Sequence, residues 1–413
     1  MKTLRLKFNF KRNYIVTESS LLLMLFLIMP IVDSLSGLFH EQYPVGQIYR
    51  FILFAVMFFL LLKISQRDFL NMFLAFCAFF ICQILISDGY VQKSIQDVVK
   101  LFTPIVCITL FSEMLANKRI NLKEITNVFN KWSIMYPVLI LVPGVFGIGI
   151  NAYEGTMGWK GLFYATNEIS FILSCLIMYQ FWNLKNRITL KNLILLLLNC
   201  LSIFLMGTKT GYATIILFAV LFLFSAFRAK LGNQKIKLLL LVLICVSVFP
   251  LVFDKLQDMI KDITERWNYQ RNVYSYSVID FLFSHRLRRF DKAFEIFLND
   301  KMWYPIIGWG FGAELVGFPN MEMDFFDVLF RTGILGLIYI VWFYVKCVLR
   351  FGSRNIFGKI MLLWSLALSF GAGHVIFYGQ SGMMLALFFV FVSQIKKVET
   401  EQFNYIRRGL KTV

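Results

Sequence analysis

The chain has 413 residues, of which 58% are hydrophobic and 16% are charged. Soluble domains carry about a quarter charged residues, so this composition excludes an ordinary soluble enzyme or binding module. The formal net charge is +18. In a membrane protein such an excess comes from cytoplasmic loops and from contact with anionic lipid, so we do not expect nucleic acid as a partner.

Apolar runs of nearly spanning length recur along the chain, beginning with Ser20–Leu38. That first run has no A-x-A-like cleavage site, so we predict a membrane helix rather than a signal peptide. Backbone amides in lipid must be satisfied within their own segment, so the runs are helices. We predict an all-α polytopic membrane protein, one integral membrane domain over residues 1–413, with about twelve transmembrane helices near residues 18–38, 48–64, 69–87, 98–116, 132–150, 167–184, 189–207, 210–228, 235–253, 324–349, 356–374 and 380–396.

Basic residues alternate between the two sides of these predicted helices. The even-numbered loops and both tails hold most of the lysines and arginines, whereas the odd-numbered loops hold few. The positive-inside rule therefore predicts that both termini lie in the cytoplasm. It also predicts that one large polar insert, residues 254–323 between the ninth and tenth spans, is extracellular. The amphipathic segment Ile120–Trp132 falls on the cytoplasmic side, where we expect an interfacial helix that joins two spans.

The first polar cluster on the predicted outer side is Gly158–Glu168. Thr166 or Asn167 is a suitable N-cap, and Glu168 would lie in the first turn of the following helix. Lys160 is suited to binding anionic groups, and Asn167 to hydrogen bonds with sugar or phosphate. The alternative is a capped helix with an aromatic belt at the membrane interface and no binding role.

A second cluster, Gly207–Gly211, joins two spans. It combines the cation of Lys209, two hydroxyl groups and exposed backbone amides, which together suit phosphate. It is not a Walker A loop, because the upstream glycine spacing is absent. In the alternative interpretation, Lys209 only extends its side chain to the membrane interface.

The insert carries a dense basic patch at Ser284–Asp291. Arginine binds phosphate oxygens in pairs, so Arg286 and Arg289 are candidate diphosphate ligands. The alternative is a helix face on which arginines pair with neighbouring acids. Downstream, the Gly308–Gly312 run predicts a flexible turn and is weak functional evidence by itself.

The insert ends in acidic residues at the start of the next span. Glu322, Asp324 and Asp327 are either partners of the helix dipole or candidate proton acceptors. Arg331 lies about two turns into the helix, where an ionisable residue is costly and is a functional candidate. Asp324 and Asp327 share its helical face, so we predict an ion pair with Arg331. His374, at the end of the eleventh span, adds an imidazole to the same layer, although a lone histidine is more often structural.

In this order, the clusters resemble the O-antigen polymerase and O-antigen ligase superfamily of bacterial membrane glycosyltransferases, and most closely its polymerase-like members. The resemblance covers roughly residues 150–380. It rests on Gly161-x-Phe163…Asn167-Glu168, Gly207-Thr208-Lys209-Thr210, Ser284-His285-Arg286, Gly308-x-Gly310, Glu322-x-Asp324 with Gly333, and Gly373-His374.

The resemblance implies a GT-C-like enzyme in the bacterial plasma membrane that needs neither a metal nor a cofactor. Such enzymes use glycans carried on undecaprenyl diphosphate and release the diphosphate lipid at the outer face. In this chain Arg286, with Arg289 or Lys209, would stabilise charge on the departing diphosphate.

The acceptor hydroxyl also needs a base, which would be Asp324, Glu322 or His374. In the ligase branch a histidine near the end of the large loop has this role. Here Glu322 and Asp324 occupy that region, which favours a polymerase. Outer aromatic residues are suited to stacking on sugars, although an interface belt accounts equally well for some of them: Trp159, Phe163, Trp303, Tyr304 and Trp309.

The leading hypothesis is a polymerase that joins lipid-linked oligosaccharide repeat units into a surface polysaccharide. Its partners would be undecaprenyl-diphosphate-linked oligosaccharide, membrane lipid, and the chain-length regulator and flippase of the same pathway. One alternative is a ligase that moves finished glycan to a final acceptor. Another is a polysaccharide or lipid flippase, but transporters tend to carry internal repeats, and no convincing repeat occurs in this chain.

Overall fold

The fold was analysed in a computed structural model that describes residues 6–7, 15–39, 44–86, 91–151, 158–228, 286–351, 356–373 and 375–409, together with residues 257, 261, 268 and 283. Helices dominate, and the predicted all-helical class is confirmed; a two-residue antiparallel pair, β1 (Leu6–Lys7) and β2 (Ile15–Val16), precedes the first helix. The helices are α1 (Glu18–Leu38), α2 (Val45–Ile64), α3 (Gln66–Ile86), α4 (Val91–Ala116), α5 (Leu122–Val145), α6 (Thr166–Asn186), α7 (Leu190–Met206), α8 (Lys209–Arg228), α11 (Arg288–Asn299), α12 (Tyr304–Ile307), η1 (Ala313–Val316), α13 (Asp324–Phe351), α14 (Ile356–Ala372) and α15 (Gly379–Gly409).

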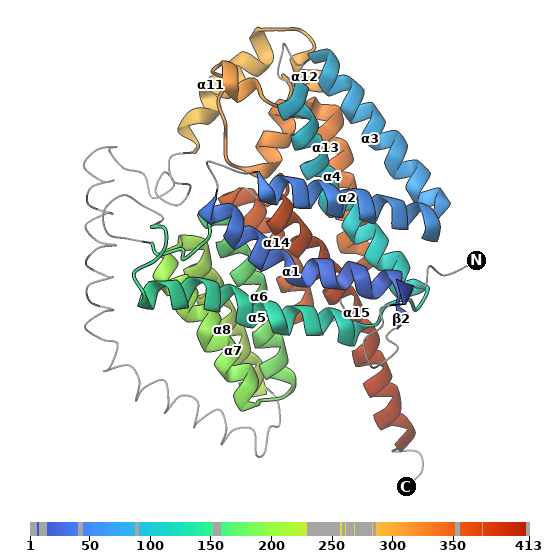
Figure 1. The fold of residues 1–413 in the computed structure, drawn as a ribbon, viewed down its shortest axis with the longest axis vertical. Helices are drawn as coiled ribbons and strands as arrows, with labels where there is room; N and C mark the ends of the chain where they lie inside the picture. Colours follow the sequence, from blue (N-terminus) through green and yellow to red (C-terminus); the bar gives the residue numbers. More distant parts are fainter. Residues whose placement is uncertain are drawn as a thin grey trace.

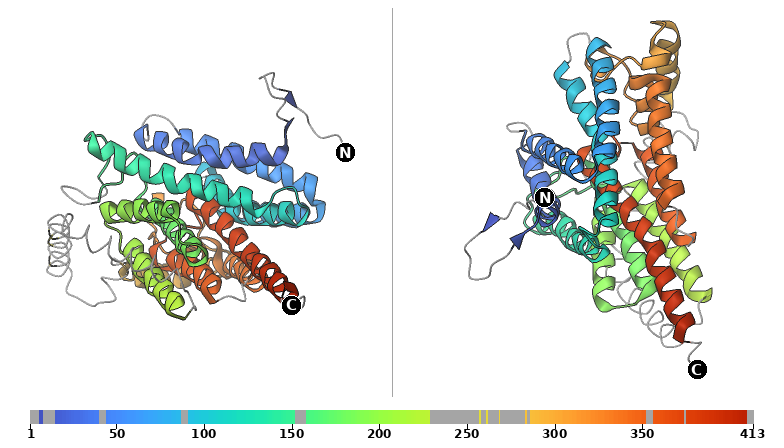
Figure 2. Two further views of the ribbon diagram at one scale, coloured as in Figure 1. Left: turned by 90° about the horizontal axis from the view of Figure 1, so that it is seen from below. Right: turned by 90° about the vertical axis from the view of Figure 1, so that its right-hand side faces the viewer.

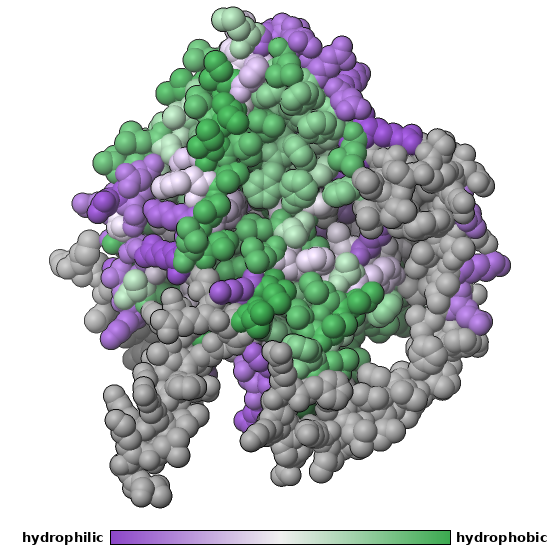
Figure 3. Space-filling view, turned by 180° about the vertical axis from the view of Figure 1, so that it is seen from behind, coloured by the Kyte–Doolittle hydropathy of each residue, from purple (hydrophilic) through white to green (hydrophobic). Residues whose placement is uncertain are grey.

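The chain is a multi-pass membrane protein. Among the described residues, α1, α2, α3, α4, α5 and α13 are long and apolar enough to cross a bilayer, and α7, α8, α14 and the first half of α15 are shorter apolar helices. Figure 3 shows a broad apolar surface across one face of the molecule, with hydrophilic residues towards its margins. The predicted ninth span, residues 235–253, lies outside the described residues, so twelve spans stay a prediction.

The α4 helix lies at the centre of the bundle, and α3 lies at its edge. In the most apolar stretch of α4, 78% of the residues are buried inside the protein, against 6% in α3. The α4 helix packs against α2, α3 and the last helix, α15 (Figures 1 and 2). A second group forms around α6, which contacts α7, α8 and α15. Since α3 buries so little against the protein, most of its surface is left for lipid.

The segment Ile120–Trp132 is not a separate interfacial helix, and that prediction is wrong. It is continuous with the following span in one helix, α5. Asn121 and Glu124 form a capping box, in which the Asn121 side chain accepts from the Glu124 N–H and the Glu124 carboxylate accepts from the Asn121 N–H. Phe129 and Trp132 are buried, so the apolar face of this segment packs inside the protein.

The N-terminal part of α13 is interrupted by a kink at Gly333, whose φ is 67° and ψ is −172°. The carbonyls of Phe330 and Arg331 accept hydrogen bonds from the backbone N–H groups of Trp309 (2.9 Å) and Gly310 (3.1 Å). The Gly308–Gly312 run is therefore fixed against α13, and it is not the flexible turn that the sequence predicts. Gln83 of α3 anchors it further, because its Oε1 accepts from the Phe311 N–H at 2.7 Å.

Candidate functional site

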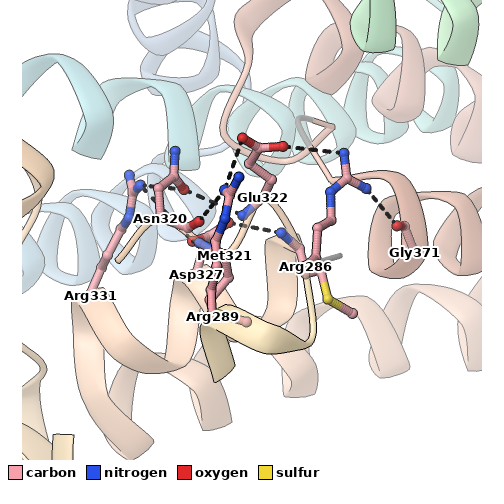
Figure 4. Close-up of polar contacts among 9 residues, drawn as sticks. Arg286, Arg289, Asn320, Met321, Glu322, Asp327, Arg331 and Gly371 are labelled. Atoms are coloured by element: carbon pink, nitrogen blue, oxygen red, sulfur yellow. Dashed lines mark hydrogen bonds and ion pairs between the residues drawn. The ribbon is translucent and has the colours of Figure 1, made fainter. Parts of the chain in front are cut away.

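Two arginines of the polar insert converge on one glutamate (Figure 4). Arg286 Nη2 lies 3.5 Å from Glu322 Oε2, and Arg289 Nη1 lies 3.2 Å from Glu322 Oε1. Arg286 is buried, whereas the side chain of Arg289 is 47% exposed and that of Glu322 is 32% exposed. The result is a cationic pair around a carboxylate that solvent or a ligand can reach.

Two backbone carbonyls, one of them at the end of α14, hold the side chains of Arg286 and Arg289 in place. Arg286 Nη1 donates to the Gly371 carbonyl at 2.8 Å, and Arg289 Nη1 donates to the Asn320 carbonyl at 2.9 Å. Glu322 has a φ of 56°, in the left-handed region that residues with a side chain seldom adopt. A Cβ atom on Gly373 would lie 1.9 Å from the Glu322 carbonyl oxygen. The Glu322 backbone thus packs directly on a position that only glycine can fill.

Asp324 is a structural residue in this arrangement. Its side chain is completely buried. Its Oδ2 accepts hydrogen bonds from the Ser369 hydroxyl (2.6 Å) and from the backbone N–H groups of Val375 (2.9 Å) and Ile376 (2.8 Å). A buried carboxylate that accepts three hydrogen bonds stabilises the backbone that it binds. Asp324 therefore joins α13 to the segment between α14 and α15.

Arg331 lies on the other side of Asn320, and its ion pair with Asp327 is confirmed at 4.0 Å. Its Nη2 also donates to Asn320 Oδ1 at 3.2 Å, and its Nη1 lies 3.8 Å from Asp97 Oδ2 of α4. Asp327 in turn accepts from the backbone N–H groups of Met321 and Met323. Arg331 thereby orients Asn320, whose carbonyl accepts a hydrogen bond from Arg289.

Asp97 is the counter-ion of three cations. Besides Arg331, it contacts Lys93 at 3.5 Å and Lys100 at 2.9 Å. These residues line a cavity of about 30 Å³ together with Asn320, Asp324, Asp327, Phe377 and Tyr378. Such a volume has room for about one water molecule and not for a sugar ring.

Tyr378 lies between α14 and α15 and lines this cavity. Burial raises the pKa of its hydroxyl, the carboxylates of Glu168, Asp97 and Asp324 raise it further, and Arg331 lowers it. The hydroxyl is therefore a neutral hydrogen-bonding group. The Lys100 ammonium, which pairs with Asp97, lies 5.7 Å from the centroid of the Tyr378 ring.

The other predicted ligands gather around the starts of α6 and α8. Lys160 Nζ donates to the Tyr164 carbonyl at 2.6 Å, and burial lowers the pKa of its ammonium. Asn167 lies in the first turn of α6, and Lys209 is the first residue of α8. The α6 helix begins at Thr166, and its N-cap is Ala165, which makes no side-chain cap; the predicted Thr166 or Asn167 cap is wrong.

Two further residues, Trp309 and His374, were predicted to belong to the site. The Trp309 indole is 5% exposed and stacks on Phe330, with ring centroids 5.0 Å apart and an interplanar angle of 11°. Its other neighbours include Phe318 and Phe297. The exposed ring face that sugar stacking needs is absent, so Trp309 is a core residue. His374 lies outside the described residues, as do Ser284 and His285.

The comparison with protein families decides the identity of the chain. The model of the O-antigen ligase-like membrane proteins matches residues 16–263. The chain belongs to this family. No curated protein matches the chain by sequence. O-antigen ligase-like proteins are membrane glycosyltransferases or ligases that act on lipid-linked glycans, so the protein is an enzyme of this type.

The matched region of this O-antigen ligase-like protein contains Asp97, Lys160 and Lys209 but ends before Arg286 and Glu322. The site is therefore assembled from both sides of the boundary at residue 263. Ionisable residues inside apolar helices are the signal that would have found the members missed in the sequence. Among the site residues described above, Asp97 was missed; outside the site, Asp33 of α1 and Arg50 of α2 carry the same signal, and their Oδ1 and Nη2 atoms lie 3.1 Å apart.

Proposed function

We propose that the protein polymerises oligosaccharide repeat units carried on undecaprenyl diphosphate, at the outer face of the plasma membrane. The observation that carries this proposal is the convergence of Arg286 and Arg289 on the accessible carboxylate of Glu322. Two guanidinium groups that share one anion have the arrangement that a diphosphate requires. In the absence of substrate, Glu322 takes the place of that diphosphate.

The reaction is a substitution at the anomeric carbon of the donor glycan. The acceptor hydroxyl oxygen forms a bond to this carbon, and the bond between the carbon and the diphosphate oxygen breaks. The electron pair leaves with undecaprenyl diphosphate, and Arg286 and Arg289 stabilise the charge that develops there. The proton of the acceptor hydroxyl passes to a carboxylate, and the products are the extended glycan and the free diphosphate lipid.

Glu322 is the base that this geometry favours over Asp324. Asp324 is fully buried and its Oδ2 accepts three hydrogen bonds, whereas the Glu322 side chain is 32% exposed. While both arginines contact Glu322, its carboxylate is a poor proton acceptor. When the diphosphate draws the arginines away, Glu322 loses two cationic neighbours and its affinity for a proton rises. Binding of the donor thus activates the base.

The polar groups at the starts of α6 and α8 are assigned to the glycan of the acceptor. Lys160 and Lys209 supply cations, and Asn167 supplies an amide. Tyr378 lines the cavity that contains Asp97 and Arg331, and α15, which begins directly after Tyr378, packs against α6. A lipid-linked acceptor can reach such a site sideways from the bilayer.

A ligase that transfers glycan to a different final acceptor is the second candidate, because the matching family model is that of ligase-like proteins. The two activities share the donor site and differ only in the acceptor. A flippase is a weaker alternative, since it needs no base beside the arginine pair.

The test is coupling in vitro. Purified protein in proteoliposomes is supplied with short repeat units on undecaprenyl diphosphate, and the products are separated on a gel. A ladder of increasing length supports the polymerase. Arg286→Ala should reduce the rate about 100–1,000-fold, as loss of one group that stabilises developing charge does. Arg288→Ala, which removes an exposed arginine of the same turn, is the matched control.

Two other outcomes of this assay would contradict the polymerase proposal. Transfer of a single unit to an added non-lipid acceptor, without a ladder, would identify a ligase. Movement of intact lipid-linked units across the membrane without any coupling would identify a flippase and overturn the proposal.

A further inference from the structure

A cavity of about 380 Å³ lies between α3, α4 and α13. It is formed by the start of α3 and the C-terminal halves of α4 and α13, so it lies at the opposite end of α4 and α13 from Asp97 and Arg331. It is therefore separate from the transfer site described above. Its volume falls within the range of small-molecule sites, about 300–1,000 Å³.

The walls of this cavity carry opposite charges. Asp68 of α3 and Glu113 of α4 supply two carboxylates, and Lys346 and Arg350 of α13 supply two cations. Within the described part of the chain, no ion pair joins Glu113 or Lys346 to another residue. Lys346 instead lies over the ring of Trp342, 4.8 Å from its centroid. Glu113 and Lys346 thus line one cavity without an ion pair between them, and a ligand that carries both charges would give each of them a partner.

The remaining lining adds an unsatisfied polar atom and an apolar wall. The Ser112 hydroxyl is buried without a hydrogen-bond partner. Ile108, Met72 and Phe343 supply apolar surface. Tyr339 and Arg350 lie about 16 Å apart along the α13 axis at 1.5 Å per residue. That length covers a lipid headgroup and the upper part of its acyl chains within one leaflet, since the hydrocarbon core is about 30 Å thick.

We propose that this cavity binds a phospholipid with a primary-amine headgroup, of the phosphatidylethanolamine type. The phosphate contacts Lys346 and Arg350, and the ammonium group donates to Glu113 and Asp68. The acyl chains lie along the apolar wall and leave past Trp342, which is exposed. The positive-inside prediction places this end of the bundle in the cytoplasmic leaflet.

Other common headgroups fit this charge pattern less well. Phosphatidylglycerol has a phosphate for the cations but leaves Glu113 and Asp68 without a positive partner. The quaternary ammonium group of phosphatidylcholine has no N–H to donate to a carboxylate. The distribution of charge therefore selects the primary amine.

The test is lipid competition followed by native mass spectrometry. The purified protein is equilibrated with equal amounts of phosphatidylethanolamine, phosphatidylglycerol and phosphatidylcholine in micelles. We expect phosphatidylethanolamine to be retained at least about five-fold over either competitor, a difference of about 1 kcal/mol. The double variant Glu113→Gln, Lys346→Gln should retain the three lipids almost equally. Glu295→Gln, Lys191→Gln makes the same charge change at two exposed positions and should keep the preference.

Equal retention by the unaltered protein, or a preference for phosphatidylglycerol, would overturn the proposal. So would a phosphatidylethanolamine preference that survives in the double variant. Soluble glycerophosphoethanolamine should not displace the bound lipid at millimolar concentration; if it does, the ligand is a soluble phosphoamine and the lipid assignment is wrong. If the double variant does not fold, brominated phosphatidylethanolamine should quench the unaltered protein more than Trp342→Phe, and equal quenching would count against the site.

Discussion

Replacing Gly333 by alanine should break the contact between α12 and α13 that fixes the Arg331 backbone. Gly333 has a φ of 67° and a ψ of −172°, a region that only glycine adopts readily, and a side chain there costs about 1–3 kcal/mol. An added Cβ would also lie 2.2 Å from the Ile306 carbonyl oxygen. Because that atom belongs to the backbone, α12 has to move.

The movement of α12 breaks two backbone hydrogen bonds, which the N–H groups of Trp309 and Gly310 donate to the carbonyls of Phe330 and Arg331. Each contributes about 1 kcal/mol net. Together with the backbone strain, we expect Gly333→Ala to lower the free energy of unfolding by about 3–5 kcal/mol. The Arg331 carbonyl then keeps only the hydrogen bond from Gln83 Nε2, at 3.2 Å, so the Arg331 backbone is held less firmly and coupling activity should fall as well.

Gly207→Ala is the matched control. Gly207 has a φ of 66° and a ψ of 30°, and no atom lies within 4 Å of the position that its Cβ would take. Gly207→Ala should lower the free energy of unfolding only by the strain of a side chain in the left-handed region, about 1–2 kcal/mol. Both variants are unfolded by increasing SDS in dodecyl maltoside micelles, followed by circular dichroism. If the two lose the same stability, the packing of α12 on Gly333 contributes nothing and the reasoning is refuted.

Four further substitutions separate structural from catalytic roles, with the same unfolding assay as the readout. Asp324→Asn should lower stability by about 2–4 kcal/mol, because an acceptor of three hydrogen bonds loses its charge, whereas Glu322→Gln at the accessible ion pairs should change it by less than about 1 kcal/mol; equal losses would contradict this division. Asp97→Asn should cost about 2–3 kcal/mol because the buried Arg331 keeps only part of its counter-charge, and a neutral effect would show that water screens this cluster. Trp309→Ala should cost about 3–5 kcal/mol as a core truncation; unchanged stability with a raised KM would instead restore the sugar-stacking role.

Local spacing predicted the contacts that lie within one element. Arg331 and Asp327 are four residues apart on a helix, and their ion pair follows from helical geometry. The apolar runs predicted helices because lipid leaves the backbone no other partners. The start of α5 was misplaced, since a capping box at Asn121 begins the helix before the apolar run.

Contacts between distant elements were beyond the reach of the sequence. Asp97 and Arg331 meet because α4 and α13 pack into one bundle, and neither residue has a local signal that names the other. Trp309 stands in a polar segment, where an aromatic ring is compatible with a belt, a ligand site or a core. Only the approach of Phe330 and Phe318 decides that it is buried. The different roles of Asp324 and Glu322 likewise depend on where α14 ends, because the Asp324 carboxylate binds the backbone segment that follows this helix.

The contacts that hold Glu322 and Asp324 to the end of α14 also set the order in which the site is made during synthesis. Arg286 needs the carbonyl of Gly371, Glu322 needs the bare backbone at Gly373, and Asp324 needs the amides of Val375 and Ile376. All of these leave the ribosome after the helices α1 to α13, and protein chains fold from the N-terminus as they emerge. A nascent chain thus inserts most of its bundle while its arginine pair is still incomplete. On the mechanism proposed above, a nascent chain that has not yet reached Gly371 therefore lacks a complete donor site.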